Sequence, residues 1–179
     1  YAEFICSLFQ KLFKEKPIWR ERKTCKAIDL IISGVKLVEE LEMHGLVRGN
    51  KIKNRVSFPN WIWTNIEYQK ACVRGLMDTD GGCYFHTHIV NGIAYKNFGM
   101  CFTSYSLPIM QSVSTVLKSL GLKFSMAKNR IYIYDFKEII KYFELIGSHN
   151  QKNIEKFQYY LNQNIIPKMQ KKILMTMFL

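Results

Sequence analysis

Two carboxylates and two glycines stand together in the segment VRGLMDTDGG, at residues 73–82. Asp78 and Asp80 close a stretch with the spacing of a helix, and Gly81 and Gly82 follow directly. The carbonyl end of a helix already carries a partial negative charge, so further carboxylates are unfavourable there unless a cation is held nearby. Magnesium suits such a position, because it takes one or two carboxylates and completes its shell with water and phosphate oxygens. A plain solvated turn is the alternative interpretation of the same residues.

The helix before these carboxylates presents a face of small side chains. Cys72, Gly75 and Thr79 have the spacing that brings residues to one side of a helix, and Ala71 lies beside them. A second helix could approach that side closely, backbone against backbone. The sequence therefore predicts that residues 65–80 form a helix with one face open to a partner helix.

Basic side chains outnumber acidic ones, with 26 Lys and Arg against 14 Asp and Glu and a net charge of +12. The excess spreads along the chain, so we expect a broad basic surface, for which nucleic acid is the commonest partner. Five scattered cysteines without a CxxC pair favour a reducing, intracellular compartment, either a bacterial cytoplasm or an organelle matrix. No run of about 18 apolar residues and no basic amphipathic helix with aromatic anchors occurs, so no membrane partner is expected.

Apolar periodicity and turn residues predict the order of the elements. In chain order these are a helix (1–14), a hairpin (18–33), a helix (34–46), a helix (65–80), a hairpin (83–104), a helix (106–122), a hairpin (123–135) and a helix (136–148). The two later hairpins should turn at Asn91-Gly92 and Lys128-Asn129, and Ser106 should cap its helix. The order helix–hairpin–helix occurs twice, at 1–46 and 106–147, as in a duplicated unit.

The segment VRGLMDTDG resembles the signature of the LAGLIDADG homing endonucleases, with matches at Gly75, Leu76, Asp78, Asp80 and Gly81. The context agrees, because a strand pair follows the motif, then a helix ending in SLGLKF, then the segment NRIYIYDFKEIIKYFELIGSHNQKN. The connector GNKIKNRVSFPNWI before the motif resembles the junction between the halves of two-motif members. The resemblance covers about residues 1–163.

The resemblance implies an α+β fold of LAGLIDADG-type αββαββα repeats, with antiparallel saddle-shaped sheets and helices on the convex face. Residues 1–60 then form the C-terminal part of a first, incomplete repeat and its connector. Residues 61–163 form a complete second repeat, and residues 164–179 a basic, Met-rich tail. About 40 residues of the first repeat, including its motif, are expected to be missing from this chain.

The same resemblance implies a homing-type, site-specific double-strand DNA endonuclease, a hydrolase that uses Mg²⁺ and reads the major groove with its strands. Asp80 is then a catalytic metal ligand, and Asp78 is structural or weakly supportive. The family's active-site lysine falls in the basic segment after the second helix of each repeat. That position points to Lys152 as a catalytic residue, with Lys53 as its equivalent in the first repeat.

Strand alternation selects the side chains that would face DNA, because successive residues of a strand point to opposite faces. Tyr84 and His86 alternate with Cys83 and Phe85, and the second hairpin repeats the pattern, with Ile131 and Ile133 between polar residues. The apolar set should face the core and the polar set the groove. The expected DNA contacts are Tyr84, His86, His88, Thr103, Lys128, Arg130 and Tyr132, and Tyr134 shares their face.

A member of this family needs two motif helices, paired through faces such as that of Cys72, Gly75 and Thr79. A further segment or a second polypeptide would have to supply the other helix. The alternative is a catalytically inactive derivative that binds structured RNA, as an intron RNA maturase or a structural RNA-binding protein. The acidic pair beside glycine favours the endonuclease, because RNA binding does not require it, whereas the truncated first half favours the derivative.

Overall fold

The computed structural model describes residues 1–25 and 28–163, and it separates into two compact units, Tyr1–Gly49 and Asn50–Leu179. The tail expected at residues 164–179 lies outside the described residues. Within the described part of the chain, no helix is both long and apolar enough to cross a membrane.

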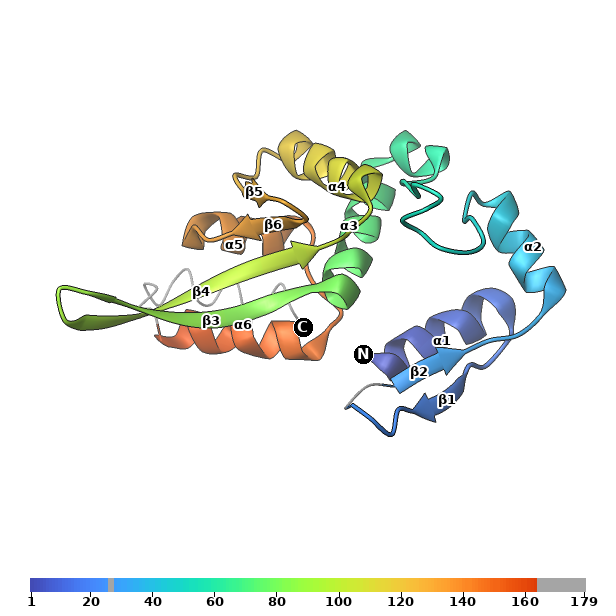
Figure 1. Cartoon of the computed structure of the whole chain (residues 1–179), viewed down its shortest axis with the longest axis horizontal. Coiled ribbons are helices and arrows are strands. Elements are labelled where there is room, and N and C mark those ends of the chain that lie inside the picture. Colours follow the sequence, from blue (N-terminus) through green and yellow to red (C-terminus); the bar gives the residue numbers. More distant parts are fainter. Residues whose placement is uncertain (26–27, 164–179) are drawn as a thin grey trace. The chain divides into compact units, whose positions relative to one another are not determined.

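The first unit is a helix, a two-stranded hairpin and a second helix (Figure 1). Its elements are α1 (Ala2–Phe13), β1 (Ile18–Glu21), β2 (Ile28–Ile31) and α2 (Val35–Met43). The two strands are antiparallel, with Ile18 opposite Ile31. The indole nitrogen of Trp19 lies 3.0 Å from the sulfur of Cys6 and so joins the hairpin to α1. These elements fall where the apolar pattern predicts them.

The second unit carries a four-stranded sheet and most of the helices. Its elements are η1 (Asn60–Thr64), α3 (Ile66–Asp80), β3 (Gly81–Val90), β4 (Ile93–Thr103), α4 (Leu107–Ser119), β5 (Ser125–Ala127), β6 (Arg130–Ile133), α5 (Phe136–Leu145) and α6 (Gln151–Gln163). From α3 onward the order is αββαββα followed by α6, so the predicted α+β fold class is confirmed. The order α4–β5–β6–α5 repeats the order α1–β1–β2–α2 of the first unit, as the sequence predicts.

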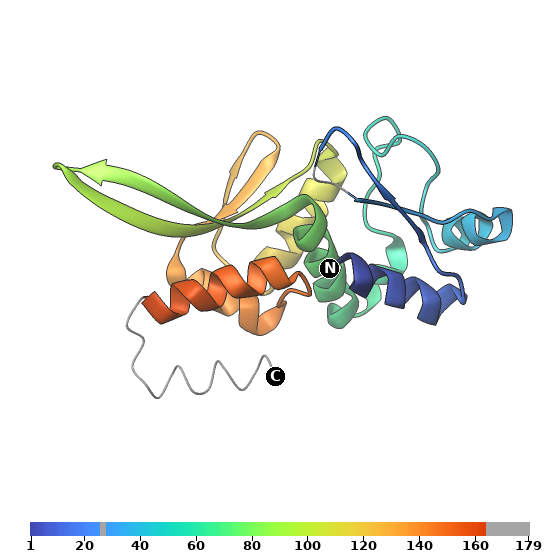
Figure 2. The same ribbon diagram turned by 90° about the horizontal axis from the view of Figure 1, so that it is seen from below.

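The sheet is antiparallel throughout, with the strand order β3-β4-β6-β5. The β3–β4 turn lies at Asn91-Gly92, as predicted, with φ of 50° and 77°, the two positive values of the tight turn that suits a twisted hairpin. β4 pairs with β6 only over Met100–Thr103, so the outer part of the β3–β4 hairpin extends as a two-stranded ribbon (Figure 1). Figure 2 shows α5 and α6 against one face of the sheet.

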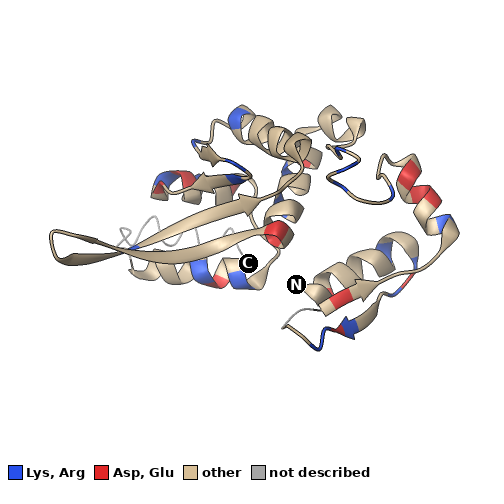
Figure 3. Ribbon diagram, in the orientation of Figure 1, with Lys and Arg blue, Asp and Glu red and all other residues tan. Residues whose placement is uncertain are grey.

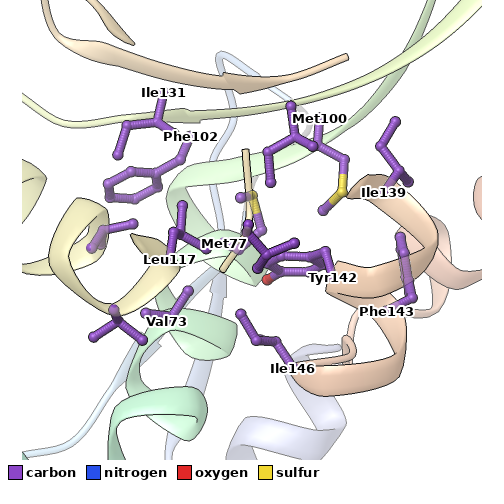
Figure 4. Close-up of a cluster of buried hydrophobic side chains, with 14 of the residues drawn as sticks. Val73, Met77, Met100, Phe102, Leu117, Ile131, Ile139, Tyr142, Phe143 and Ile146 are labelled. Carbon is purple, nitrogen blue, oxygen red and sulfur yellow. The ribbon is translucent and has the colours of Figure 1, made fainter. Parts of the chain in front are cut away.

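The core of the second unit lies between the sheet and the helices (Figure 4). Met100, Phe102, Ile131 and Ile133 from the strands are fully buried, as the strand alternation predicts for the two isoleucines, and they meet apolar residues of α3, α4 and α5. Burial of each large apolar side chain contributes about 1.5–3 kcal/mol, so this core fixes the helices on the sheet.

The junction between α3 and β3 requires glycine. A Cβ atom added at Gly81 would lie 2.5 Å from the sulfur of Met77 and 2.8 Å from the carbonyl oxygen of Cys101. Gly81 therefore allows the last turn of α3 to continue directly into β3. Asp80 consequently lies at the edge of the sheet.

The connector before α3 belongs to the second unit. Phe58 and Ile62 are buried in its core, and the hydroxyl of Ser106 donates to the carbonyl of Val56 at 2.8 Å. The two compact units therefore divide at Gly49, and the connector, which is grouped with the first repeat by sequence, packs in the second unit. Ser106 does stand at the N-cap position of α4, but its side chain makes no capping hydrogen bond, because the connector takes its hydroxyl instead.

Candidate nucleic-acid interface

One face of the sheet is left open by the helices and is concave. The hollow over this concave surface has a volume of about 760 Å³. Asp80, the last residue of α3, stands at this surface together with Gly81 and Gly82. Strands β3, β4 and β6 supply the other lining residues, most of which alternate with buried core residues such as Met100 and Ile131. The lining residues beyond Asp80 and the glycines are Cys83, Tyr84, His86, Cys101, Thr103, Arg130, Tyr132 and Tyr134.

Most of the residues expected to contact DNA are brought together on this surface. Tyr84, His86, Thr103, Arg130 and Tyr132 all line it, with Asp80 among them. Tyr134, which is expected on the same face as these contacts, lines it as well. Cys83 and Cys101 also line it, although neither is among the expected contacts. The alternation of side chains along each strand is what predicts that these residues share one face.

Two expected contacts lie elsewhere. His88 is farther out on the ribbon, where its ring stacks on that of Tyr95 with the ring centroids 5.6 Å apart. The Nδ1 atom of His88 lies 3.4 Å from the side-chain nitrogen of Asn97. Lys128 is exposed in the β5–β6 turn with a φ of 52°. Neither residue lines the concave surface next to Asp80.

A lysine does contact Asp80, but it is not one of those expected. The Nζ atom of Lys51 lies 2.9 Å from Oδ2 of Asp80, and both side chains are partly exposed. The side chain of Asn50 accepts from the backbone amides of Ile52 and Lys53 at 2.9 and 3.1 Å, which closes a turn around Lys51. The basic segment 51–55 indicates the neighbourhood, but only this turn determines which lysine contacts Asp80.

Both expected lysines lie in other positions. Lys53 has an exposed side chain and follows Lys51 in the same turn. Lys152 is exposed in the first turn of α6, where its backbone amide donates to the side chain of Asn150 at 3.2 Å.

Asp78 is buried and faces the loop between α5 and α6. Its carboxylate accepts from the hydroxyl of Ser148 at 2.5 Å and from the backbone amide of His149 at 2.7 Å. The side chain of Asn150 donates to the carbonyl of Asp78 at 3.0 Å. Burial lowers the pKa of the His149 imidazole, Arg74 lowers it further, and the carboxylate of Asp78 opposes both. This loop therefore anchors the last turn of α3 and leaves only Asp80 of the acidic pair at the concave surface.

Helix α6 covers the start of β3, which is an edge strand. The side chain of Asn153 accepts from the backbone amide of Cys83 at 3.1 Å, and Nζ of Lys156 donates to its carbonyl at 2.7 Å. An edge strand leaves such backbone groups unpaired unless another element covers them. Burial raises the pKa of the Cys83 thiol to about 12, and the charge of Lys156 opposes that rise. The apolar pattern does not predict α6, and these two residues are absent from the expected site.

A row of stacked rings runs from the concave surface out along the ribbon. Tyr132 and Tyr134 are 5.2 Å apart with their planes 12° from parallel. His86 and His88 are 6.1 Å apart at 27°, and His88 and Tyr95 are 5.6 Å apart at 21°. Because these rings stack on one another, each ring covers part of the face of its neighbour.

Gly99 makes room for two rings of this surface. A Cβ atom at Gly99 would lie 3.1 Å from the ring of Tyr84 and 3.3 Å from that of Tyr134. Burial, together with the neighbouring Tyr134 hydroxyl, raises the pKa of Tyr84, so its hydroxyl stays protonated at neutral pH. The Nδ1 atom of His86 is buried and has no hydrogen-bond partner among the described residues.

The surface around Asp80 is otherwise free of carboxylates. Residues 81–134 include all four strands of the sheet and contain no Asp or Glu, but they contain five basic residues, Lys96, Lys118, Lys123, Lys128 and Arg130. Figure 3 shows acidic residues at the end of α3 but none on β3 or β4. Within residues 1–25 and 28–163, no three His, Cys, Asp or Glu side chains gather closely enough to hold a metal ion. The surface thus offers Asp80 as a single exposed carboxylate in a basic setting.

No protein-family model and no curated protein matches this chain. Among solved structures it is similar to the LAGLIDADG homing endonuclease I-GzeII, which was crystallised in complex with a DNA target. The sequence identity is 11%, the TM-score is 0.40, and the match covers 60% of this chain and 42% of the endonuclease. The matched region is therefore less than half of that endonuclease's length.

Proposed function

We propose that this chain is the DNA-reading part of a homing-type, site-specific double-strand endonuclease that hydrolyses phosphodiesters with magnesium. The strands β3–β6 would lie in the major groove and bring Asp80 to the phosphate to be cleaved. The position of Asp80 carries the proposal, because it is an exposed carboxylate on a concave sheet face without any other acidic side chain.

Charge supports nucleic acid as the partner. Phosphates dominate the affinity of proteins for DNA, and carboxylates near them weaken binding. The absence of Asp and Glu from residues 81–134 fits a phosphate-facing surface. A carboxylate kept at the edge of such a surface opposes binding, so we infer that it serves chemistry through a cation.

Ring orientation supports a duplex over a single strand. Platforms for single-stranded nucleic acid expose ring faces on which bases stack. Here Tyr132 stacks on Tyr134 and His86 stacks on His88, so neighbouring rings cover part of each other's faces. The hydroxyl groups of the two tyrosines suit hydrogen bonds to base edges in the major groove, which is wide enough for a two-stranded ribbon.

Asp80 fits one half of a magnesium site. Magnesium binds through one or two carboxylates and keeps water and phosphate oxygens in its shell, which a single exposed side chain allows. When bound, the metal would supply an activated water and stabilise the charge that develops on the phosphate. Lys51 compensates the charge of Asp80 when no metal is there, and we expect the metal to displace it.

The other half of the site would come from a second motif helix, carried by another segment or by a second polypeptide. Around Gly75 the face of α3 is open, because an added Cβ atom would meet no heavy atom within 4 Å. The hydroxyl of Thr79 bonds to the carbonyl of Gly75 in its own helix at 2.9 Å, which keeps the face flat. A helix with small residues on its own face fits there and would bring a second carboxylate beside Asp80.

The test is a binding and cleavage experiment on the full chain. Duplexes selected from a random-sequence library serve as the substrate, with Mg²⁺ and with EDTA, and a protein that carries an intact motif helix is added for the cleavage reaction. We expect Asp80→Asn to bind the selected duplex as the wild type does and to lose cleavage by about two orders of magnitude. Asp135→Asn, at the N-cap of α5, is the control that removes a charge elsewhere.

Two results would argue against the proposal. Tighter binding of structured RNA than of any selected duplex would favour the RNA-binding derivative. Duplex binding without cleavage, even when a protein with an intact motif helix is added, would leave DNA binding as the whole function.

A further inference from the structure

The outer end of the β3–β4 ribbon continues the concave face with apolar side chains. The strand register pairs Tyr84 with Gly99, which lies under the ring row. Six residues farther along β3, next to the turn, the same register pairs Val90 with Ile93. Because side chains on one face recur every second residue, Val90 and Ile93 share the face of Tyr84.

This pair is exposed at the tip of a projecting hairpin. Val90 is 46% exposed and Ile93 is 59% exposed. Exposed apolar residues at the end of a two-stranded ribbon favour aggregation, so their presence calls for a partner. Ile89 is also exposed, at 73%, but it points to the opposite face.

The charge of the hairpin limits what that partner can be. Residues 81–103 contain no Asp or Glu and one lysine, Lys96. A ribbon without carboxylates can enter a groove between phosphate chains at no repulsive cost. Inside the major groove the apolar group on offer is the C5-methyl of thymine, which small apolar side chains contact.

We propose that Val90 and Ile93 contact thymine methyl groups at the outer end of the DNA site. The inference rests on the proposed function, because it takes the ribbon to lie in the major groove. It also gives the surface a means of distinguishing DNA from RNA, since uracil lacks this methyl group. The polar residues His88 and Tyr95 lie next inward on the same face and suit hydrogen-bonded readout instead.

The strand length predicts where the thymine lies. β3 runs from Gly81 to Val90, which is roughly 30 Å of extended chain at about 3.3 Å per residue. The rise along the helix axis is about 3.4 Å per base pair, so a strand of that length spans at most roughly nine base pairs. The preferred thymine should therefore lie within about nine base pairs of the phosphate at Asp80.

The experiment selects duplexes from a random-sequence library with the full wild-type chain and then replaces individual thymines by deoxyuridine. Deoxyuridine keeps every hydrogen bond of thymine and removes only the methyl group. We expect one or two outer positions at which the replacement weakens binding about threefold to fourfold, the effect of one buried methyl group. Inner positions should respond less.

Variants connect the effect to the ribbon tip. Val90→Ser with Ile93→Ser removes the methyl groups of both side chains and leaves small polar groups in their place. This double variant should bind thymine and deoxyuridine duplexes equally, while Ile89→Ser, on the opposite face of the same tip, should keep the discrimination.

The outcomes separate this proposal from the proposed function. A wild-type chain that selects a duplex but ignores every deoxyuridine replacement would overturn the thymine contact and leave DNA binding intact. If the wild-type chain selects no duplex at all, both the thymine contact and the proposed DNA binding would be overturned. Sedimentation of the free proteins is the last check, because a dimer that the double variant splits would show that the tip binds a second copy instead.

Discussion

The ammonium group of Lys51 lies 2.9 Å from the carboxylate of Asp80, and the turn closed by the side chain of Asn50 holds it there. This ion pair joins the connector to the end of α3. The two segments are adjacent in space but well separated in sequence. An exposed ion pair of this kind adds little to stability. Its effect should instead appear in the affinity of Asp80 for cations.

Removal of Lys51 should strengthen cation binding at Asp80. Lys51→Met deletes a positive charge that competes with a metal for Oδ2, and charges this close interact by about 1–4 kcal/mol near a protein surface. We expect Mn²⁺, followed by electron paramagnetic resonance, to bind about tenfold more tightly to the variant without DNA. Lys53→Met changes the net charge equally without touching Asp80, and an equal gain in that control would mean that the effect is only long-range charge.

The contacts around Asp80 also show what the sequence predicts and what it leaves open. Local patterns predict α3, the turn at Asn91-Gly92 and the polar face through Tyr84 and Arg130, because each depends on residues a few positions apart. Three features depend on residues far apart in the chain, which leave no periodic pattern. These features are the Lys51–Asp80 pair, the loop that holds Asp78, and the cover that α6 places on the edge of β3.

The buried carboxylate of Asp78 should matter for stability. Asp78→Ala leaves the hydroxyl of Ser148 and the amide of His149 without their acceptor, and losing such bonds to a buried charge costs about 2–4 kcal/mol. Urea unfolding monitored by circular dichroism measures the change. The comparison is Asp135→Ala, which removes the exposed N-cap of α5 and should cost about 1 kcal/mol. Equal losses in the two variants would contradict an anchoring role for Asp78.

The open face of α3 should respond to a methyl group in two opposite ways. Gly75→Ala fills empty space and removes a flexible residue from a helix, so the free energy of unfolding should rise by about 0.5–1 kcal/mol. The same methyl group stands between α3 and any partner helix, so cleavage with a protein that supplies the second motif should fall. Destabilisation of the free chain would show instead that the face is already covered.

Gly81→Ala is the counterpart of that substitution at the end of the same helix. Its Cβ atom would lie 2.5 Å from the sulfur of Met77 and under 3 Å from two carbonyl oxygens. Two of these neighbours are backbone atoms, so the junction between α3 and β3 would have to move. We expect a loss of about 1–3 kcal/mol in the urea experiment, in contrast to the gain at Gly75.

Alkaline pH should weaken the fold through the buried thiol of Cys83. Burial raises its pKa from 9.0 to about 12, so above pH 9 the unfolded chain releases this proton while the folded chain keeps it. The unfolded state then binds fewer protons, and the free energy of unfolding falls as the pH rises from 9 towards 12. Between pH 8 and pH 10 this thiol alone should contribute a loss of about 1 kcal/mol. Urea unfolding of Cys83→Ala at both pH values should show a loss smaller by that amount, whereas Cys25→Ala, at an exposed site, should keep the wild-type dependence. A wild-type chain equally stable at both pH values would mean that the Cys83 thiol ionises in the folded protein as readily as in the unfolded chain.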